Sequence, residues 1–301
     1  MLSSALDKAG GMPDPSSVHA QRSRPSRSAQ NIALARAHLD RVGVIHDRLA
    51  IGMLDGGWIV ATRILGLAPL RRLAAERAFL AIAARTLALD DFLTEAMAAD
   101  VSQVVILGAG FDGRAVRLAA NGVTYFEVDD PLTQEHKQWV VGRFPFDWPA
   151  RFVAADLTAP TWGRSLITAG MKPQQPTAFI SEGVSMYLSA EDNAAVLKTA
   201  SQLCSGHASL AMHVACENQP GAVPPPLGAR AMTRVVARLT RSEPIRWLPD
   251  LSEARAVVAS SGWNIRGCAD LQTLWSSRST ASSHPPRAAL TSAFIIEAVR
   301  A

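Results

Sequence analysis

The sequence predicts an α/β protein with one doubly wound sheet, and three observations lead to this prediction. The chain has 301 residues, of which 48% are hydrophobic and 19% charged, enough apolar side chains for one large core. From residue 101 onward, short β-rich runs alternate with helical patterns, which is typical of parallel strands joined by helices. The first run, VVIL, leads directly into Gly108 and Gly110 and then into a helical stretch, an arrangement that suits ligand binding.

Two segments precede the predicted sheet. Residues 1–29 are rich in Ser, Pro, Gly and Arg, a composition that buries too little apolar surface to offset the entropy of ordering, so we expect a disordered tail. From residue 30 to about residue 100, apolar residues recur at helical spacing, as in IALARAHLDRV and AERAFLAIAARTLALDDFLTEAM. We therefore predict a single domain over residues 30–301, with a helical cap (30–100) before a core (101–301).

Seven runs in the core have the length and composition of strands: QVVILG, VTYFEVD, RFVAAD, TAFISEG, HASLAMHV, GWNIRGCA and LTSAFIIEAV. The last run follows a Pro-rich loop, SSHPPRAA, and suits an antiparallel addition to the parallel sheet. Pro and Gly are frequent in ENQPGAVPPPLGAR, which begins a segment over residues 217–248 that we expect to form a loop or lid.

Composition and charge exclude several function classes. The net charge is +4 and the sequence pI about 9.3, but 26 of the 30 basic residues are scattered arginines, so we expect no nucleic-acid partner. The three cysteines are odd in number and lack metal-ligand or redox spacing, which indicates a reduced compartment and no metal site. No signal peptide or membrane span is evident, so the sequence predicts a soluble cytoplasmic protein with no membrane partner.

The glycine turn is open to a second interpretation. The string GAGFDG satisfies G-x-G-x-x-G, and Glu127 or Asp129 lies about 20 residues further on, as in NAD-dependent dehydrogenases. Asp112 argues against this alternative, because a carboxylate is unfavourable beside a pyrophosphate but harmless beside a cation. The long helical segment before the first strand is also unusual for such dehydrogenases.

Four strings in order resemble the motif set of the leucine carboxyl methyltransferase family: QVVILGAGFDGRAVRL, YFEVDDPLTQEHK, AADL and SEGVSMYLSAED. The resemblance covers residues 30–205, with a fainter match in the closing strands. It implies the seven-stranded class I methyltransferase fold, S-adenosyl-L-methionine as cofactor and O-methyl transfer as activity. At Gly113 the chain departs from the family, which usually has Thr there, and this leaves the exact geometry of the turn open.

The resemblance also implies roles in cofactor binding. Gly108 and Gly110 would pass beneath the methionine part of the cofactor, and Asp129 would accept hydrogen bonds from the ribose, with Glu127 as an alternative. Asp156 and Leu157 would hold the adenine.

The cofactor's amino-acid part and the acceptor involve a second group of residues. Glu182 matches the family's acid near the methionine amino group, and Arg85 matches the arginine that pairs with the cofactor carboxylate, with Arg77 as a weaker candidate. Met186 and Tyr187 would line the acceptor pocket by analogy.

The acceptor itself is not encoded in a motif. A carboxylate is ionised at neutral pH and needs no general base, whereas a hydroxyl would need one, and His213 near the end of the fifth strand is the candidate. We expect a small-molecule or peptide acid, received by a pocket that the cap and the 217–248 segment form, with these candidates: Trp58, Arg63, Arg230, Arg234 and Trp247. A non-catalytic module that only binds the cofactor remains a further alternative, and the oligomeric state is open.

Overall fold

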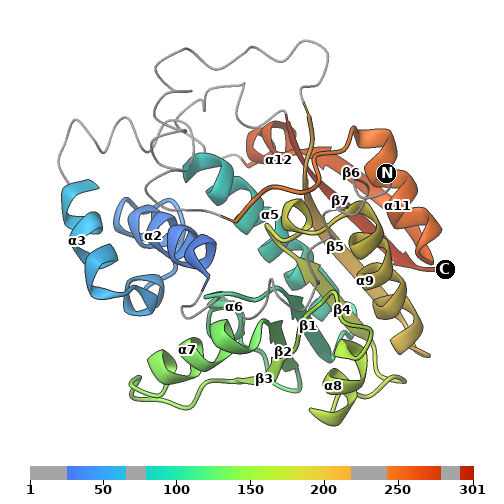
Figure 1. Ribbon diagram of the computed structural model, residues 1–301, viewed down its shortest axis with the longest axis horizontal. Coiled ribbons are helices and arrows are strands. Elements are labelled where there is room, and N and C mark those ends of the chain that lie inside the picture. Colours follow the sequence, from blue (N-terminus) through green and yellow to red (C-terminus); the bar gives the residue numbers. More distant parts are fainter. Residues whose placement is uncertain (1–25, 66–78, 218–242, 279–291) are drawn as a thin grey trace, which may run out of the picture.

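The computed structural model describes residues 26–65, 79–217, 243–278 and 292–301, and all structural statements below refer to these ranges. One sheet of seven strands organises them (Figure 1). The strands coincide with the seven predicted runs: β1 (Gln103–Leu107), β2 (Thr124–Asp129), β3 (Ala150–Ala154), β4 (Thr177–Ser181), β5 (Ala208–Ala215), β6 (Trp263–Asp270) and β7 (Ala293–Arg300).

The strand order is β3-β2-β1-β4-β5-β7-β6. The first five strands are parallel, whereas β7 runs antiparallel to both of its neighbours, β5 and β6. The predicted doubly wound sheet and its antiparallel last strand are therefore confirmed. The strand order reverses between β1 and β4, and ligands of doubly wound sheets bind beyond the carboxyl ends of the strands at such a point.

The central strands have continuous apolar runs because both faces of the sheet are covered. Along β1, Val105 and Leu107 belong to one hydrophobic cluster, while Val104 and Ile106 belong to another on the opposite face. The first cluster includes side chains of α8 (Trp162–Thr168), α9 (Ala190–Leu203) and α11 (Leu251–Ser260). The second includes side chains of α5 (Leu80–Ala98) and α12 (Leu271–Ser276).

The remaining helices are α2 (Arg27–Arg41), η1 (Ala50–Met53), α3 (Gly56–Leu65), α6 (Arg114–Arg117), α7 (Pro131–Val141) and η3 (Ser185–Tyr187). In Figure 1, α2 and α3 lie together at one side of the molecule. They precede the first strand as predicted, whereas α5, the last helix before β1, packs against the sheet. Within the described ranges, no helix combines the length and the hydrophobicity needed to cross a membrane.

The structure bears on the predicted bounds of the tail, and only in part on those of the 217–248 segment. The tail expected over residues 1–29 is too long, because α2 begins at Arg27 and Ser26 caps it by accepting the N–H of Ala29 at 3.3 Å. The rest of that tail, residues 1–25, lies outside the described residues, as do residues 218–242 of the segment expected to be a loop or lid.

Candidate functional site

The register of the sheet aligns the predicted site residues. Leu107 of β1 pairs with Val128 of β2 and with Ser181 of β4, so the residues that follow them (Gly108, Asp129 and Glu182) form a row at the carboxyl edge of the sheet. His213 extends this row on β5, since Ser181 pairs with Met212. Neighbouring strands lie about 4.8 Å apart, so the row brings Gly108, Asp129 and Glu182 within reach of one small ligand.

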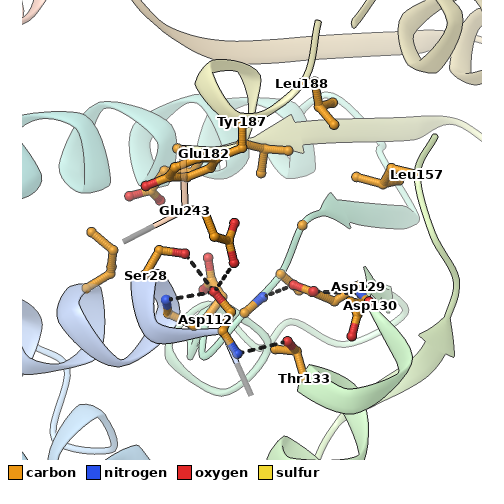
Figure 2. Close-up of a pocket in the computed structure, with 18 of the residues that line it drawn as sticks. Ser28, Asp112, Asp129, Asp130, Thr133, Leu157, Glu182, Tyr187, Leu188 and Glu243 are labelled. Carbon is orange, nitrogen blue, oxygen red and sulfur yellow. Dashed lines mark hydrogen bonds between the residues drawn. The ribbon is translucent and has the colours of Figure 1, made fainter. Parts of the chain in front are cut away.

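A cavity of about 750 Å³ opens at this edge (Figure 2). It lies between the strand ends, the amino-terminal part of α2, η3 and the extended segment that contains Glu243 and Arg246. Nine of the predicted site residues line it: Arg85, Gly108, Gly110, Asp129, Asp156, Leu157, Glu182, Met186 and Tyr187. Their side chains come from segments far apart in the sequence, which meet only in this fold.

The glycine turn after β1 needs its glycines. Gly108 and Gly110 have φ values of +64° and +48°, a region that residues with a Cβ atom rarely occupy. A Cβ atom on Gly108 would also overlap a methyl group of Val184. The backbone of this turn is therefore exposed to the cavity without a side chain in between.

Asp129 presents its carboxylate at the end of β2. It accepts hydrogen bonds from the backbone N–H groups of Gly110 (2.5 Å) and Asp130 (2.7 Å). Burial raises the pKa of Asp129 to about 6, and the two backbone hydrogen bonds limit this rise. Each carboxylate oxygen can accept more than one hydrogen bond, so ligand hydroxyls can add to these contacts.

Glu127 does not share this position. Its side chain is fully buried, contacts Lys137 Nζ at 2.6 Å and accepts a hydrogen bond from Trp148 Nε1 at 3.0 Å. It is absent from the cavity lining, so the alternative ribose acid of the sequence analysis is excluded by geometry.

Asp156 and Leu157 follow β3. Figure 2 shows Leu157 on the side of the cavity where Asp129 lies. Oδ1 of Asp156 accepts hydrogen bonds from the backbone N–H and the hydroxyl of Thr158, both at 2.8 Å, which fixes the turn that carries the pair. This position suits the predicted contact with a planar base.

Glu182 is the centre of a buried ionic cluster. Its carboxylate contacts Arg36 Nη2 at 2.9 Å, Arg85 Nε at 2.9 Å and Arg114 Nη1 at 2.6 Å. Burial opposes ionisation, but the guanidinium groups of Arg114, Arg36 and Arg85 outweigh it and hold the pKa of Glu182 well below its usual value. Thus Glu182 is a fixed negative charge in the cavity wall.

Arg36 was not distinguished in the sequence. It lies on the face of α2 that Ala29, Ile32 and Ala33 also present to the cavity, at helical spacing. It is 3% exposed, and its Nε has no hydrogen-bond partner among the described residues. With Arg85 it gives the cavity two buried guanidinium groups, which suit a carboxylate ligand. A charged residue on an otherwise apolar helix face was the signal that could have found it.

His213 is buried on β5 but does not line the cavity. Burial and, to a lesser extent, the positive charge of Arg85 lower the pKa of His213 to about 3. Both observations argue against its predicted role as a general base, because the imidazole does not face the cavity and has little affinity for a proton.

Three further residues predicted for the acceptor pocket do not line this cavity. Trp247 belongs to the core cluster under α9 and α11, Trp58 packs against the cluster formed by α2 and α7, and Arg63 is exposed. The burial of Trp247 in the core makes its assignment to the pocket wrong. The assignments of Trp58 and Arg63 stay predictions, because residues 218–242 of the expected pocket lie outside the described residues. The other pocket candidates, Arg230 and Arg234, lie outside the described residues, as does Arg77, the weaker candidate for pairing with the cofactor carboxylate.

The departure at Gly113 has a local cause. Gly113 has φ −104°, which any residue can adopt, but a Cβ atom there would come within 3.0 Å of Asp47 Oδ1. In this chain the carboxylate of Asp47 occupies the space beside the turn, where a larger side chain at position 113 would meet it.

Strand order and site together define a class I methyltransferase fold. Comparison with known proteins agrees: the family model described as leucine carboxyl methyltransferase matches residues 28–201, more than half of the chain. The chain belongs to this family. A crystal structure from Thermobifida fusca described as "a putative methyltransferase" has the same fold, with a TM-score of 0.53, 16% identity, and coverage of 96% of this chain and 98% of that one.

Two curated relatives are similar over part of their length. The "Putative S-adenosyl-L-methionine-dependent methyltransferase" of Mycobacterium avium is 44% identical over 114 residues, 37% of this chain and 36% of that protein. A protein of the same description from Parafrankia sp. is 39% identical over 134 residues, 44% of this chain and 43% of that protein. The chain thus matches less than half the length of these relatives.

Proposed function

We propose that this protein transfers the methyl group of S-adenosyl-L-methionine to an oxygen atom of a small acceptor. The observation that carries the proposal is the row of Gly108, Asp129 and Glu182 in one cavity with the buried arginines Arg36 and Arg85. When bound, this cofactor supplies a methyl group on a cationic sulfur. The two similar proteins from Mycobacterium avium and Parafrankia sp. are described as methyltransferases that depend on it.

The cavity residues fit the parts of this cofactor. Asp129 accepts hydrogen bonds from ribose hydroxyls, and Asp156 and Leu157 hold the adenine. Arg36 and Arg85 bind the carboxylate, while Glu182 binds the ammonium group. The amino-acid part of the cofactor is a zwitterion, and the cavity wall presents both a positive and a negative group to it.

The dehydrogenase alternative finds no support. The reversed β7 between β5 and β6 departs from the all-parallel order of dinucleotide-binding sheets. The helix after the glycine turn, α6, has only four residues, and the buried carboxylate of Asp112 lies beside it, which disfavours a pyrophosphate.

The non-catalytic alternative is tested by measuring turnover. Binding of the cofactor without methyl transfer to any acceptor would favour this alternative.

For the acceptor we propose a carboxylate of a small-molecule or peptide acid rather than a hydroxyl, with neither nucleic acid nor membrane as partner. No histidine lines the described cavity, so no imidazole there can act as a general base. Tyr187 does line it, but burial, followed by the negative charge of Glu243, raises the pKa of its hydroxyl, so it is a poor general base near neutral pH. Arg246 at the mouth contacts Asp192 at 3.4 Å and is 53% exposed, a weak pair that an anionic acceptor can exchange.

This acceptor assignment predicts the pH–rate profile. Once an acceptor is found by screening acids and phenols, we expect a rate at saturating cofactor that changes little between about pH 6 and 9, because a carboxylate with a pKa of about 4 stays ionised. The His213→Gln variant should give the same profile, since His213 does not line the cavity. A rate that rises with an apparent pKa of about 6 to 7 and depends on His213 would instead indicate a hydroxyl acceptor and a general base.

A second prediction concerns Asp129 and cofactor affinity. Because ribose hydroxyls donate to the ionised carboxylate, we expect S-adenosylhomocysteine to bind more tightly as the pH rises from about 5 to 7, through the pKa of about 6. Isothermal titration at several pH values measures this. The Asp129→Asn variant should bind more weakly and show a flat profile. The same slope in that variant would assign the titration to another group.

A further inference from the structure

One buried arginine contacts the cavity residues without lining the cavity itself. Arg114 is fully buried, and its Nη1 contacts Glu182 Oε2 at 2.6 Å and also Asp112. Its Nε donates to Asp90 Oδ1 at 2.6 Å, and its Nη2 donates to the backbone carbonyl of Thr86 at 3.1 Å. Glu182 and Asp112 line the cavity, whereas Arg114 does not.

The planar guanidinium connects three separate elements in this way: the end of β4, the glycine turn after β1, and helix α5. Helix α5 also carries Arg85, next to Thr86 in the sequence, and Arg85 contacts Glu182 from its other side. Thr86 Oγ1 donates to Glu182 Oε1 at 3.3 Å, so Arg114 adds a further polar link to the direct contacts between α5 and Glu182.

The energetics suggest that such a cluster serves geometry more than stability. Four arginines and four acids of the described chain make up the cluster, so its formal charge is balanced: Arg36, Arg85, Arg114 and Arg117 with Asp47, Asp90, Asp112 and Glu182. Taking such charges out of water is costly, and apolar replacements of similar size are often as stable. A fixed spatial arrangement of the charges is what an apolar core could not provide.

We propose that Arg114 is a positioning residue, which holds Glu182 and helix α5 so that Glu182, Arg36 and Arg85 together receive the amino-acid part of the cofactor. The proposal rests on the proposed function. It predicts that a defect at Arg114 affects recognition of the amino-acid part and leaves recognition of the nucleoside part unchanged. The backbone N–H groups of Gly110 and Asp130 hold Asp129, and Thr158 contacts Asp156.

Two ligands separate these parts. S-adenosylhomocysteine contains the nucleoside and the amino acid, whereas 5′-methylthioadenosine contains the nucleoside alone. The Arg114→Lys variant keeps the charge but loses the planar fork that reaches four acceptors: Glu182, Asp112, Asp90 and the carbonyl of Thr86. We expect its affinity for S-adenosylhomocysteine to fall about tenfold or more, and its affinity for 5′-methylthioadenosine to stay within about twofold of wild type.

Arg278→Lys is the matched control. Arg278 also contacts α5, where it donates to the carbonyl of Leu87 at 2.7 Å and pairs with Asp91, but neither of these residues lines the cavity or contacts Glu182, so both affinities should stay within about twofold of wild type. If Arg114→Lys does not fold, Asp90→Asn weakens the link between Arg114 and α5 and should selectively reduce the affinity for S-adenosylhomocysteine.

The outcomes are distinguishable. An equal loss for both ligands in folded Arg114→Lys, or an unchanged affinity for S-adenosylhomocysteine, would overturn the positioning role. Failure of the wild type to bind S-adenosylhomocysteine at all would contradict the proposed function and this inference with it.

Discussion

The Glu182→Gln variant should have a free energy of unfolding about 3 to 5 kcal/mol lower than that of the wild type, because it leaves three buried guanidinium groups without their shared anion. Urea unfolding of both proteins measures the difference. Asp91→Asn is the control: Asp91 is exposed, and its pair with Arg278 lies at the surface, so its removal should change stability by about 1 kcal/mol or less. Equal losses in the free energy of unfolding for Glu182→Gln and Asp91→Asn would contradict a special contribution of the buried cluster to stability.

The same variant should change how stability depends on pH. The pKa of Glu182 is held well below its usual value, and that of Asp112 is lowered to about 2, by Arg114 first and then Arg36, against the opposing effect of burial. Lowered folded-state pKa values contribute stability that is present above about pH 4 and is lost as the pH falls toward about 2. We expect a shallower loss over this range in Glu182→Gln, and an unchanged slope would show that other carboxyl groups account for it.

The second large effect is expected at Gly108. Alanine there must adopt a left-handed conformation, which costs about 1 to 2 kcal/mol, and its methyl group must displace Val184, which costs about 1 to 3 kcal/mol. We expect Gly108→Ala to lower the free energy of unfolding by about 2 to 5 kcal/mol and to weaken binding of S-adenosylhomocysteine.

Gly122→Ala separates the two contributions to this effect. Gly122 has φ +82°, but nothing lies within 4 Å of the position of its Cβ atom, so only the conformational cost of about 1 to 2 kcal/mol applies. Cofactor affinity should be unchanged in this variant, since Gly122 does not line the cavity. Equal losses of stability in Gly108→Ala and Gly122→Ala would show that the contact with Val184 relaxes freely.

The sheet could be predicted because its signals are local. Strands such as VVIL and TAFIS are buried on both faces and therefore appear as continuous apolar runs. The resemblance to the family implied roles for Gly108, Asp129 and Glu182, and the parallel register of β2, β1 and β4 places all three at the same edge of the sheet. Helices α11 and α12 were not anticipated, because they are short and lie next to Pro- and Ser-rich segments.

The partners of the charged residues could not be predicted. Arg36 lies 146 positions before Glu182 in the sequence, and helical spacing does not indicate which carboxylate an arginine meets. The start of α2 is a similar case. Ser26 lies in a segment whose composition predicted a disordered tail, yet it donates hydrogen bonds to Thr133 (3.4 Å) and Glu243 (3.1 Å). Contacts over such separations arise from the tertiary fold, which local composition does not encode.

Parallel calorimetric titration with S-adenosylhomocysteine and NAD tests the central claim most directly. The structure predicts that the wild type binds S-adenosylhomocysteine in the micromolar range or tighter and does not bind NAD. It also predicts that Asp129→Ala weakens the binding of S-adenosylhomocysteine by about 1 to 3 kcal/mol, since ribose hydroxyls lose a charged acceptor. Tight binding of NAD with no response to S-adenosylhomocysteine would contradict the proposed function.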